Sequence, residues 1–206
     1  MSFIKKNIKN LKKRVKKIIS YLKMRTELKN KRKINVGSGN LAFNNDWFSC
    51  DIEILDITKK TDWYLLLGYY KVSNIFAEHV WEHLDDKDTD IANKNCYRFL
   101  KKNGRLRIAV PDGYHPSKDY IDYVKPNGTG LGADDHKILY NYSIMKEKLE
   151  KIGFKVKLLE YWDEHGVFHH EDWKDKHGKV MRSKRYDLRN ADGSLSYTSL
   201  IVDAIK

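Results

Sequence analysis

Cysteine and proline are scarce in this sequence of 206 residues. It contains two cysteines, Cys50 and Cys96, and three prolines. The cysteines form no C-x-x-C pair and no framework of spacings, which argues against a secreted module stapled by disulfides and favours a reducing compartment. The sequence therefore predicts a cytoplasmic protein.

Long hydrophobic runs are also missing. The longest apolar run, residues 63–70, is too short to span a bilayer, and the N-terminus is charged where a secretory signal needs an apolar stretch. We expect neither a transmembrane helix nor a secretory signal. With 41% hydrophobic residues, the chain is long enough for one domain with a full-sized core.

Acidic residues are almost absent from the first 33 positions. These positions hold 14 lysines and arginines but one acid, Glu27, whereas the rest of the chain holds 26 basic and 27 acidic residues. The net charge of +12 therefore belongs to an N-terminal arm, placed at residues 1–30, and not to the body at residues 31–206. Because a nucleic-acid groove needs positive charge on the body itself, we expect no specific nucleic-acid partner.

The arm has the pattern of an amphipathic helix. Apolar residues recur every three or four positions and lysines fill the other faces. The stripe consists of Ile4, Ile8, Leu11, Val15, Ile18 and Leu22. A narrow apolar stripe surrounded by lysine suits a helix on an anionic membrane surface. Two alternatives stay open: the stripe packs on the domain or on a second copy as a short coiled coil, or the arm contacts RNA loosely.

The body alternates between strand-like and helix-like segments. Short runs rich in β-branched and aromatic residues predict strands within residues 31–39, 47–52, 72–80, 105–113, 154–162 and 196–205. Helical spacing of apolar residues predicts helices near 88–102 and 137–152. This alternation predicts an α/β fold with a parallel sheet and helices on both faces, and ligands of such sheets bind at the carboxyl ends of the strands.

A glycine loop follows the first expected strand. Gly37-Ser38-Gly39 lacks the third glycine of the G-x-G-x-x-G dinucleotide fingerprint. Asp51 ends the second expected strand, where a carboxylate can accept hydrogen bonds from a ribose diol. The third glycine allows the helix and the strand to approach each other closely around a pyrophosphate. A ligand without phosphates does not need it.

Residues 79–83, HVWEH, spell the H-x-x-E-H string of one class of zinc metallopeptidases. Such a site needs both histidines on one helical face and a third ligand. The expected strand through Glu78 places His79 at a strand end, off any helical turn shared with His83, so we interpret the match as coincidental and expect no metal. Four later histidines match no ligand spacing and are expected to be solvated: His165, His169, His170 and His177.

Four motifs resemble those of class I S-adenosylmethionine-dependent methyltransferases, in a bacterial branch often associated with surface-polysaccharide genes. They are INVGSGN, DWFSCDI, FAEHVWEHL and GRLRIAVPDGYHP, and the tail segments GADDHK, LEYWDE, RSKRYDLRN and YTSLIVDAIK extend the likeness over residues 33–206. It departs from the branch at Ser38, at Asp46 and in TDWYLLLGYYK. The resemblance implies a Rossmann-like three-layer sandwich whose seven-stranded sheet is mostly parallel, with the last strand antiparallel.

The resemblance also implies a cofactor, S-adenosylmethionine. Its methionine part would lie on the glycine loop, its ribose on Asp51 and its adenine near Asp56, with the reacting methyl facing the end of the 72–80 strand. The implied cofactor-binding residues are Gly37, Ser38, Gly39, Asp51, Ile52, Asp56, Glu78 and His79. For Asp56, capping of a helix or turn is the alternative.

Methyl transfer from a sulfonium is an in-line displacement, in which positioning and exclusion of water supply most of the rate. A base need only help an acceptor hydroxyl lose its proton, a task suited to histidine. The candidate catalytic residues are His79, Asp112, His115, Asp135 and His136, with His115 or His136 as the base. Turn chemistry around the prolines and helix capping are the structural alternatives.

The segment at residues 163–194 is long for a connection between two strands, which favours a substrate lid. Its arginines could clamp an anionic or phosphate-bearing acceptor through bidentate hydrogen bonds, and surface salt bridging is the alternative. The expected substrate-binding residues are Tyr114, Arg182, Arg185 and Arg189.

These features favour an O-methyltransferase that modifies a sugar hydroxyl in surface-polysaccharide biosynthesis. The substrate would be a glycan, a sugar nucleotide or a lipid-linked sugar, and the arm would hold the enzyme on the inner face of the cytoplasmic membrane. The sugar part comes from the resemblance alone. Two alternatives stay open: a methyltransferase-like fold with other transfer chemistry on a glycan or nucleotide precursor, and a non-catalytic membrane-docked module.

Overall fold

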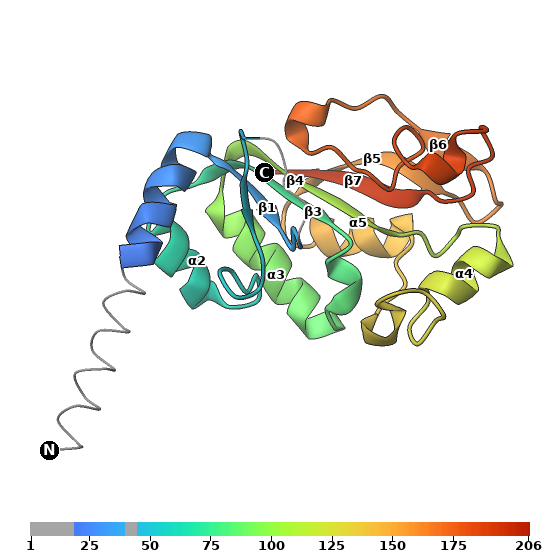
Figure 1. Cartoon of the computed structure of the whole chain (residues 1–206), viewed down its shortest axis with the longest axis horizontal. Helices are drawn as coiled ribbons and strands as arrows, with labels where there is room; N and C mark the ends of the chain where they lie inside the picture. The colour runs from blue at the N-terminus through green and yellow to red at the C-terminus, as the bar shows by residue number, and fades with distance from the viewer. Residues whose placement is uncertain (1–18, 40–44) are drawn as a thin grey trace, which may run out of the picture.

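The computed structural model describes residues 19–39 and 45–206 (Figure 1). The part of the apolar stripe from Ile4 to Ile18 lies outside the described residues, as do residues 40–44, which follow the glycine loop. None of the helices in the two described ranges is long and apolar enough to cross a membrane.

A seven-stranded sheet forms the centre of the molecule, in the order β2-β1-β3-β4-β7-β5-β6 (Figure 1). The strands are β1 Lys33–Val36, β2 Phe48–Cys50, β3 Val72–Glu78, β4 Leu100–Pro111, β5 Lys155–Trp162, β6 Phe168–His170 and β7 Ser199–Ile205. The first four strands are mutually parallel, and β7 lies antiparallel between β4 and β5. The predicted sheet, mostly parallel with an antiparallel last strand, is confirmed. The short β6, which pairs with β5, is the one strand that the sequence pattern does not predict.

The helices differ more from expectation. They are a helix over residues 19–31, α2 Lys60–Leu67, α3 Asp86–Phe99, α4 Lys118–Val124 and α5 Tyr142–Glu150, and the 3-10 turns are η1 Trp81–His83, η2 Ala133–Asp135, η3 Asp175–His177 and η4 Leu188–Asn190. The predicted helices 88–102 and 137–152 are α3 and α5. Asp85 caps α3 by accepting a hydrogen bond from the Asp88 backbone, so α3 begins earlier. Asn141 caps α5 in the same way, so α5 begins later.

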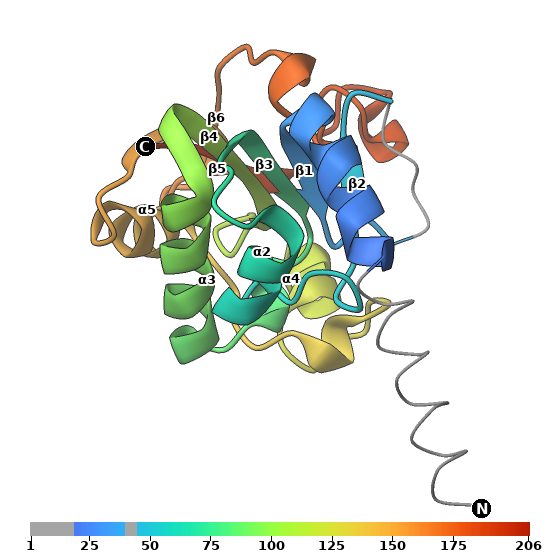
Figure 2. The ribbon, with the colours of Figure 1, turned by 90° about the vertical axis from the view of Figure 1, so that its left-hand side faces the viewer.

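Helices cover one face of the sheet. Alternate strand residues such as Ile34, Ile75 and Ile108 belong to the main core with residues of α2, α3 and α5. The helix over residues 19–31 lies beside α2 and contributes the buried Leu28, so it continues past the arm boundary expected at residue 30 (Figure 2). This part of the arm packs on the domain.

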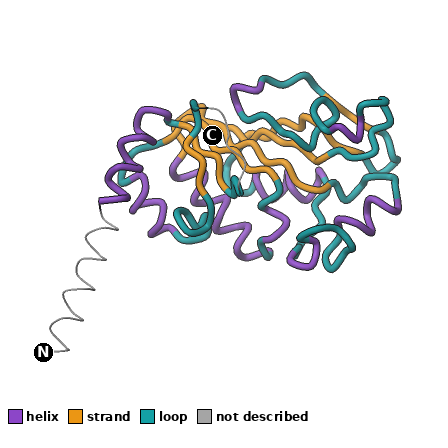
Figure 3. The backbone as a smooth tube through the Cα atoms, in the orientation of Figure 1, coloured by secondary structure: helices purple, strands orange, loops and turns teal. Residues whose placement is uncertain are grey.

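An irregular segment, residues 171–198, covers the opposite face of the sheet (Figures 1 and 3). Phe76, Ala109 and Ile201 point to this side, where they pack with Trp173 and Val180. Three layers are thus present, but within the described ranges the second covering layer has only the turns η3 and η4 where the alternating pattern predicts α-helices.

A buried arginine ties the irregular segment to the sheet. Arg107 in β4 is fully buried, and its Nε and Nη2 donate hydrogen bonds to the two Asp203 oxygens at 2.8 and 2.9 Å. Its Nη1 donates to the carbonyls of Lys174 at 3.1 Å and Gly178 at 2.7 Å. The Trp173 ring covers the guanidinium, 4.9 Å from its centroid. One side chain therefore joins β4, β7 and the segment over residues 171–198.

Candidate functional site

A cleft of about 380 Å³ lies at the carboxyl ends of β1, β2 and β3. Its lining residues come from the loops that follow these strands and from η2. They are Val36, Gly37, Asp51, Ile52, Leu55, Asp56, Ile57, His79, Val80, His83, Leu84 and Asp135. The structure thus brings together five of the residues expected to bind a cofactor, namely Gly37, Asp51, Ile52, Asp56 and His79.

Gly37 is required by the backbone at the bottom of this cleft. Its φ is +63°, and a Cβ atom at this position would stand 2.3 Å from the Val80 Cγ2 atom. Only glycine allows β1 to turn this close to the chain that leaves β3.

Asp51 is held in one orientation by the glycine loop. Its Oδ2 accepts a hydrogen bond from the Gly39 N–H at 3.0 Å, and its Oδ1 accepts one from the Ile52 N–H at 2.8 Å. The Ser38 N–H donates to the Cys50 carbonyl at 3.2 Å, which joins the loop to β2. Each oxygen of a carboxylate accepts more than one hydrogen bond, so Asp51 can still receive donors from a ligand.

Asp56 lines the same cleft and also caps a turn. Its Oδ1 accepts hydrogen bonds from the Thr58 backbone at 3.0 Å and the Thr58 hydroxyl at 2.6 Å, while its Oδ2 lies 2.7 Å from the Lys59 Nζ. Burial by itself would raise the pKa of Asp56, but the hydrogen bonds from Lys59 and Thr58 outweigh it and lower the pKa. Asp56 therefore caps a turn, which is the alternative to ligand binding given for it. It is ionised at neutral pH.

His79 stands where β3 ends, as the sequence predicts. Its φ of +56° is uncommon for a residue with a side chain, and it turns the chain out of the strand toward η1. The imidazole lines the cleft, with Nε2 3.2 Å from the Ser199 hydroxyl and Nδ1 3.0 Å from the Glu82 Oε1. The Tyr197 ring stacks at 6.4 Å between centroids.

Glu78 faces the other side of the sheet. Its carboxylate accepts hydrogen bonds from the backbone N–H groups of Met181 at 3.0 Å and Arg182 at 2.7 Å. These contacts fasten the segment over residues 171–198 above β3 and keep the carboxylate out of the cleft lining.

Asp112 is fully buried behind the end of β4. It accepts hydrogen bonds from the backbone N–H groups of Trp162 at 2.7 Å and Tyr114 at 3.0 Å. Burial raises the pKa of Asp112 to about 6. The Asp112 carboxylate thus links the loop after β4 to β5. The Tyr114 ring packs against Tyr142 of α5 at 6.0 Å.

His115 is 6% exposed and stacks on the Tyr120 ring at 3.9 Å between centroids. Its Nδ1 accepts a hydrogen bond from the Ser117 N–H at 3.2 Å, so the proton is on Nε2, which lies 3.3 Å from the Leu195 carbonyl. Burial lowers the pKa of His115. Both nitrogens are therefore engaged in local contacts, which agrees with the alternative that His115 stabilises a turn.

His136 and Asp135 lie next to the cleft, at the end of η2. The His136 Nδ1 is 2.6 Å from the Val124 carbonyl, which can only accept, so Nδ1 carries the proton and Nε2 is left as an acceptor. The His136 ring meets His83 edge-on at 4.8 Å between centroids. Asp135 lies 3.3 Å from the His83 Nδ1 and 2.8 Å from the Lys137 Nζ.

Of the three expected substrate arginines, Arg182 and Arg189 both lie close enough to Asp187 and Tyr197 to affect their charge, whereas Arg185 lies beside Asp172 and Asp175. Each has its own acidic partner: Arg182 contacts Glu78 at 4.0 Å, Arg185 contacts Asp172 at 3.4 Å and Asp175 at 3.7 Å, and Arg189 contacts Asp187 at 2.6 Å. For Arg185 these are surface ion pairs, the alternative given for these arginines, whereas the Asp187 side chain that pairs with Arg189 is only 7% exposed. The Arg189 guanidinium also lies 3.4 Å from the Tyr197 ring centroid.

Sequence reasoning missed one residue of this region, Glu82. Its side chain is 1% exposed, and neither carboxylate oxygen has a hydrogen-bond partner among the described residues, because the contact with His79 has poor hydrogen-bond geometry. An acid between Trp81 and Leu84 is the signal that could have marked it, since carboxylates are rarely buried without a counter-charge or metal.

No family model matches this sequence, and no curated protein matches it. Among solved structures, the chain is similar to a SAM-dependent methyltransferase from Archaeoglobus fulgidus, at 16% identity over 91% of this chain and 93% of that chain, with a TM-score of 0.49. It is similar to a SAM-dependent methyltransferase from Thermotoga maritima, described as a possible histamine N-methyltransferase, at 15% identity over 100% of both chains, with a TM-score of 0.49. A third similar structure is phosphoethanolamine N-methyltransferase 2 of Haemonchus contortus in complex with S-adenosyl-L-methionine, at 13% identity over 84% of this chain and 48% of that chain, with a TM-score of 0.45. At such low similarity the function has to be derived from the cleft's own residues.

Proposed function

We propose that this protein is an S-adenosylmethionine-dependent methyltransferase that methylates a sugar hydroxyl in surface-polysaccharide biosynthesis. The supporting observation is that Gly37, Asp51, Asp56 and His79 line one cleft at the carboxyl ends of three parallel strands. Ligands of open α/β sheets bind at this edge. The cleft volume of about 380 Å³ suits a small organic molecule.

The charge of the cleft favours a cofactor without phosphates. Its described lining includes three carboxylates, Asp51, Asp56 and Asp135, and neither lysine nor arginine. Lys59 and Lys137 offset the charges of Asp56 and Asp135, which leaves Asp51 to repel a pyrophosphate and to attract a sulfonium cation or an ammonium group. Asp51, with each oxygen fixed by one backbone N–H, is suited to receive both hydroxyls of a ribose.

The bound cofactor would supply an electrophilic methyl group. In the transfer, the oxygen of the acceptor hydroxyl forms a bond to the methyl carbon, the carbon–sulfur bond breaks, and its electron pair stays on sulfur as a thioether. The acceptor proton passes to a base. His79 and His83 both line the cleft, and we assign His79 as this base because it follows β3 directly and its Nε2 lies 3.2 Å from the Ser199 hydroxyl. His115 is not among the lining residues of the cleft.

The sugar acceptor rests on the resemblance of the motifs. Tyr197 is 7% exposed, with the Arg189 guanidinium over its ring, so its contact with His79 orients the imidazole.

Thermal unfolding with S-adenosylmethionine or S-adenosylhomocysteine tests the proposal. A ligand at about 100 times its dissociation constant adds roughly 2.7 kcal/mol, or a melting shift of about 5–10 °C for a chain of this size. Asp51→Ala should abolish the shift. The matched control is Asp192→Ala, on an exposed loop, which should keep it. The absence of any shift with either ligand at millimolar concentration would refute the methyltransferase proposal.

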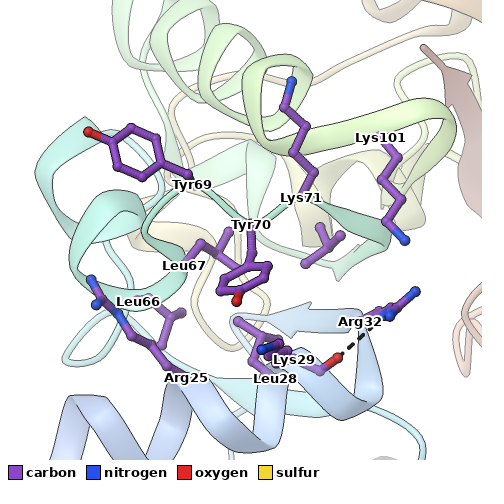
Figure 4. Close-up of a pocket in the computed structure, with 11 residues that line it drawn as sticks. Arg25, Leu28, Lys29, Arg32, Leu66, Leu67, Tyr69, Tyr70, Lys71 and Lys101 are labelled. Carbon is purple, nitrogen blue, oxygen red and sulfur yellow. Dashed lines mark hydrogen bonds between the residues drawn. The ribbon is translucent and has the colours of Figure 1, made fainter.

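A basic cavity at the opposite edge supports membrane attachment. It has a volume of about 260 Å³ and lies where β3 and β4 begin, away from the cleft (Figure 4). Five cationic side chains line it, with no acid among the described lining residues: Arg25, Lys29, Arg32, Lys71 and Lys101. Figure 4 shows the Tyr70 ring beside Lys29, whose Nζ is 4.9 Å from the ring centroid, while Tyr69 points outward.

Exposed apolar groups accompany these charges. Tyr69 is 94% exposed, and Leu22, Ile19 and Leu65 are about half exposed on the helix over residues 19–31 and on α2. Cations combined with exposed apolar side chains match the interface of an anionic bilayer. We infer that this edge rests on anionic lipid together with the arm, which leaves the cleft at the far edge open to the cytoplasm.

Vesicle sedimentation of the full-length protein tests this part. Binding to phosphatidylserine vesicles should fall at least tenfold in Lys71→Glu/Lys101→Glu, since each juxtamembrane cation contributes about 1 kcal/mol. Lys146→Glu, an exposed lysine on α5, is the control. Equal binding by the double variant and the wild type would contradict a membrane role for the cavity.

A further inference from the structure

Three side chains outside the proposed cofactor contacts converge beside the cleft. Each of Glu82, His83 and His136 offers one ligand atom, and these three atoms all lie within 4.8 Å of one another. Zinc bonds to nitrogen and oxygen are about 2.0–2.2 Å long, so two ligands of one ion stand at most about 4.4 Å apart. Small side-chain rotations are enough to bring the three atoms onto a single cation.

The carboxylate of this group is the observation that points to a ligand. Glu82 is 1% exposed, and both of its oxygens lack a hydrogen-bond partner in the described part of the chain. A buried ionised carboxylate without hydrogen bonds is costly, and a bound cation removes that cost. The nearest imidazole, that of His79, lies 3.0 Å from one Glu82 oxygen and helps to orient the carboxylate.

The two histidines already have the outer contacts typical of metal ligands. A ligating imidazole usually donates its second N–H to a carbonyl or carboxylate, which fixes the ring and its tautomer. The His136 Nδ1 is bound to the Val124 carbonyl at 2.6 Å, and the His83 Nδ1 lies 3.3 Å from the Asp135 carboxylate. In both rings Nε2 is therefore the nitrogen left to bind an ion.

The backbone fixes the meeting of these residues. The N–H groups of Lys137 and Ile138 donate to the Glu82 carbonyl, the first at 2.7 Å and the second at 3.3 Å. These bonds bring the chain after η2 onto η1 and place His136 beside Glu82 and His83. The other two residues, Glu82 and His83, are adjacent in the 3-10 turn Trp81–His83.

We propose that Glu82, His83 and His136 form a binding site for a divalent transition metal of the zinc type. Two imidazoles and one carboxylate are the donor set that Zn²⁺ and Co²⁺ accept, whereas Mg²⁺ and Ca²⁺ prefer oxygen alone. Three protein ligands leave coordination positions open, and His83 itself lines the cleft. The cation would therefore face the space beside His79.

A cation at this position would act on the acceptor. Zn²⁺ held by these three residues would lower the pKa of an acceptor hydroxyl that it contacts and so would favour loss of the hydroxyl proton when the oxygen bonds to the methyl carbon. This catalytic role rests on the proposed methyl transfer. The binding of the metal does not, and it can be measured without cofactor or substrate.

The test is a titration of tag-free, full-length protein, stripped with EDTA and dialysed, with Co²⁺ alone. Co²⁺ bound by nitrogen and oxygen in a site of four or five ligands gives visible d–d absorption, and Zn²⁺ should displace it. His83→Asn, His136→Asn and Glu82→Gln should each weaken Co²⁺ binding by at least tenfold. If one of these variants does not fold, Asp135→Asn, which weakens the contacts to His83 and to the exposed Lys137 but removes no ligand, should still weaken binding about tenfold.

The double variant His165→Asn/His170→Asn is the control, because it removes two exposed imidazoles, one from the turn after β5 and one from the end of β6. It should bind Co²⁺ as the wild type does. The proposal is overturned if millimolar Co²⁺ gives no d–d bands, if the bands persist unchanged in His83→Asn and His136→Asn, or if only the control loses them. A parallel titration of the wild type with S-adenosylhomocysteine in EDTA reports on the proposed function separately, so that either proposal can fail without the other.

Discussion

Removing the negative charge of Asp203 should destabilise the protein strongly. Its two oxygens accept the Nε and Nη2 hydrogen bonds of the fully buried Arg107, and the Arg105 guanidinium also contacts it. Asp203→Asn preserves size and shape but leaves the Arg107 charge buried without a counter-charge. The same arginine holds the carbonyls of Lys174 and Gly178, so the strain reaches the cover over residues 171–198.

The magnitude follows from the burial of both partners. Breaking a buried ion pair by removing one charge costs about 3–5 kcal/mol, because the remaining charge stays desolvated. The amide oxygen of the introduced asparagine can still accept one of the two bonds, so we expect a loss near the lower end, about 3 kcal/mol. With a urea m-value of about 2 kcal/mol/M, the unfolding midpoint falls by about 1.5 M.

Urea unfolding followed by tryptophan fluorescence measures this loss, since Trp173 covers the Arg107 guanidinium. The control is Glu150→Gln, which removes a charge from the ion pair with Lys146, where both side chains are 47% exposed. Such exposed pairs contribute about 1 kcal/mol or less. If the midpoint of Asp203→Asn falls no further than that of Glu150→Gln, the buried pair does not anchor the cover as argued.

The remaining predictions concern the cleft and its supports. Gly37→Ala should cost more than about 2 kcal/mol in urea unfolding and abolish S-adenosylhomocysteine binding, because it combines a positive φ with a clash against Val80. Gly39→Ala, which meets nothing within 4 Å, should cost only about 1 kcal/mol, and equal costs would contradict the close packing at Gly37. Burial raises the pKa of Asp112 from 3.8 to about 6, so the folded state holds its proton more firmly than the unfolded state and stability should fall as pH rises from about 4 to 6. Asp112→Asn should flatten that part of the stability profile, and an unchanged slope would contradict the shift.

Most strands could be anticipated along the chain because they carry their own signal. β-branched and aromatic runs mark β1, β3, β5 and β7, and a glycine follows β1. The sequence signal for α2 is weaker. Lys59 precedes the helix without a capping side chain, and the buried Trp63 and Leu66 lie in an apolar run with no clear helical spacing. Arg107 in the middle of a strand signals a partner, but nothing local identifies Asp203 or the cover that both residues hold.

The meeting of the residues that follow β1, β2 and β3 was predictable for a geometrical reason. Gly37, Asp51 and His79 each follow a parallel strand, and parallel strands end at one edge, so local assignments place all three together. The same reasoning could not tell which of the histidines on loops would reach the cleft. His115 is engaged by the distant Leu195 and His136 by Val124, and such contacts depend on how loops pack.

The string at residues 79–83 shows what spacing can and cannot exclude. The strand end at Glu78 does separate His79 from the turn that carries His83, so a helical zinc motif is absent from the described structure. The strand end separates only the ligands within the string, however. At the carboxyl edge of a sheet, loops from distant parts of the chain meet, and here two backbone hydrogen bonds to the Glu82 carbonyl bring His136 to the same place. Because the third ligand comes from another loop, the buried carboxylate of Glu82, which has no hydrogen-bond partner in the described structure, is stronger evidence for a cation than the spacing of the two histidines.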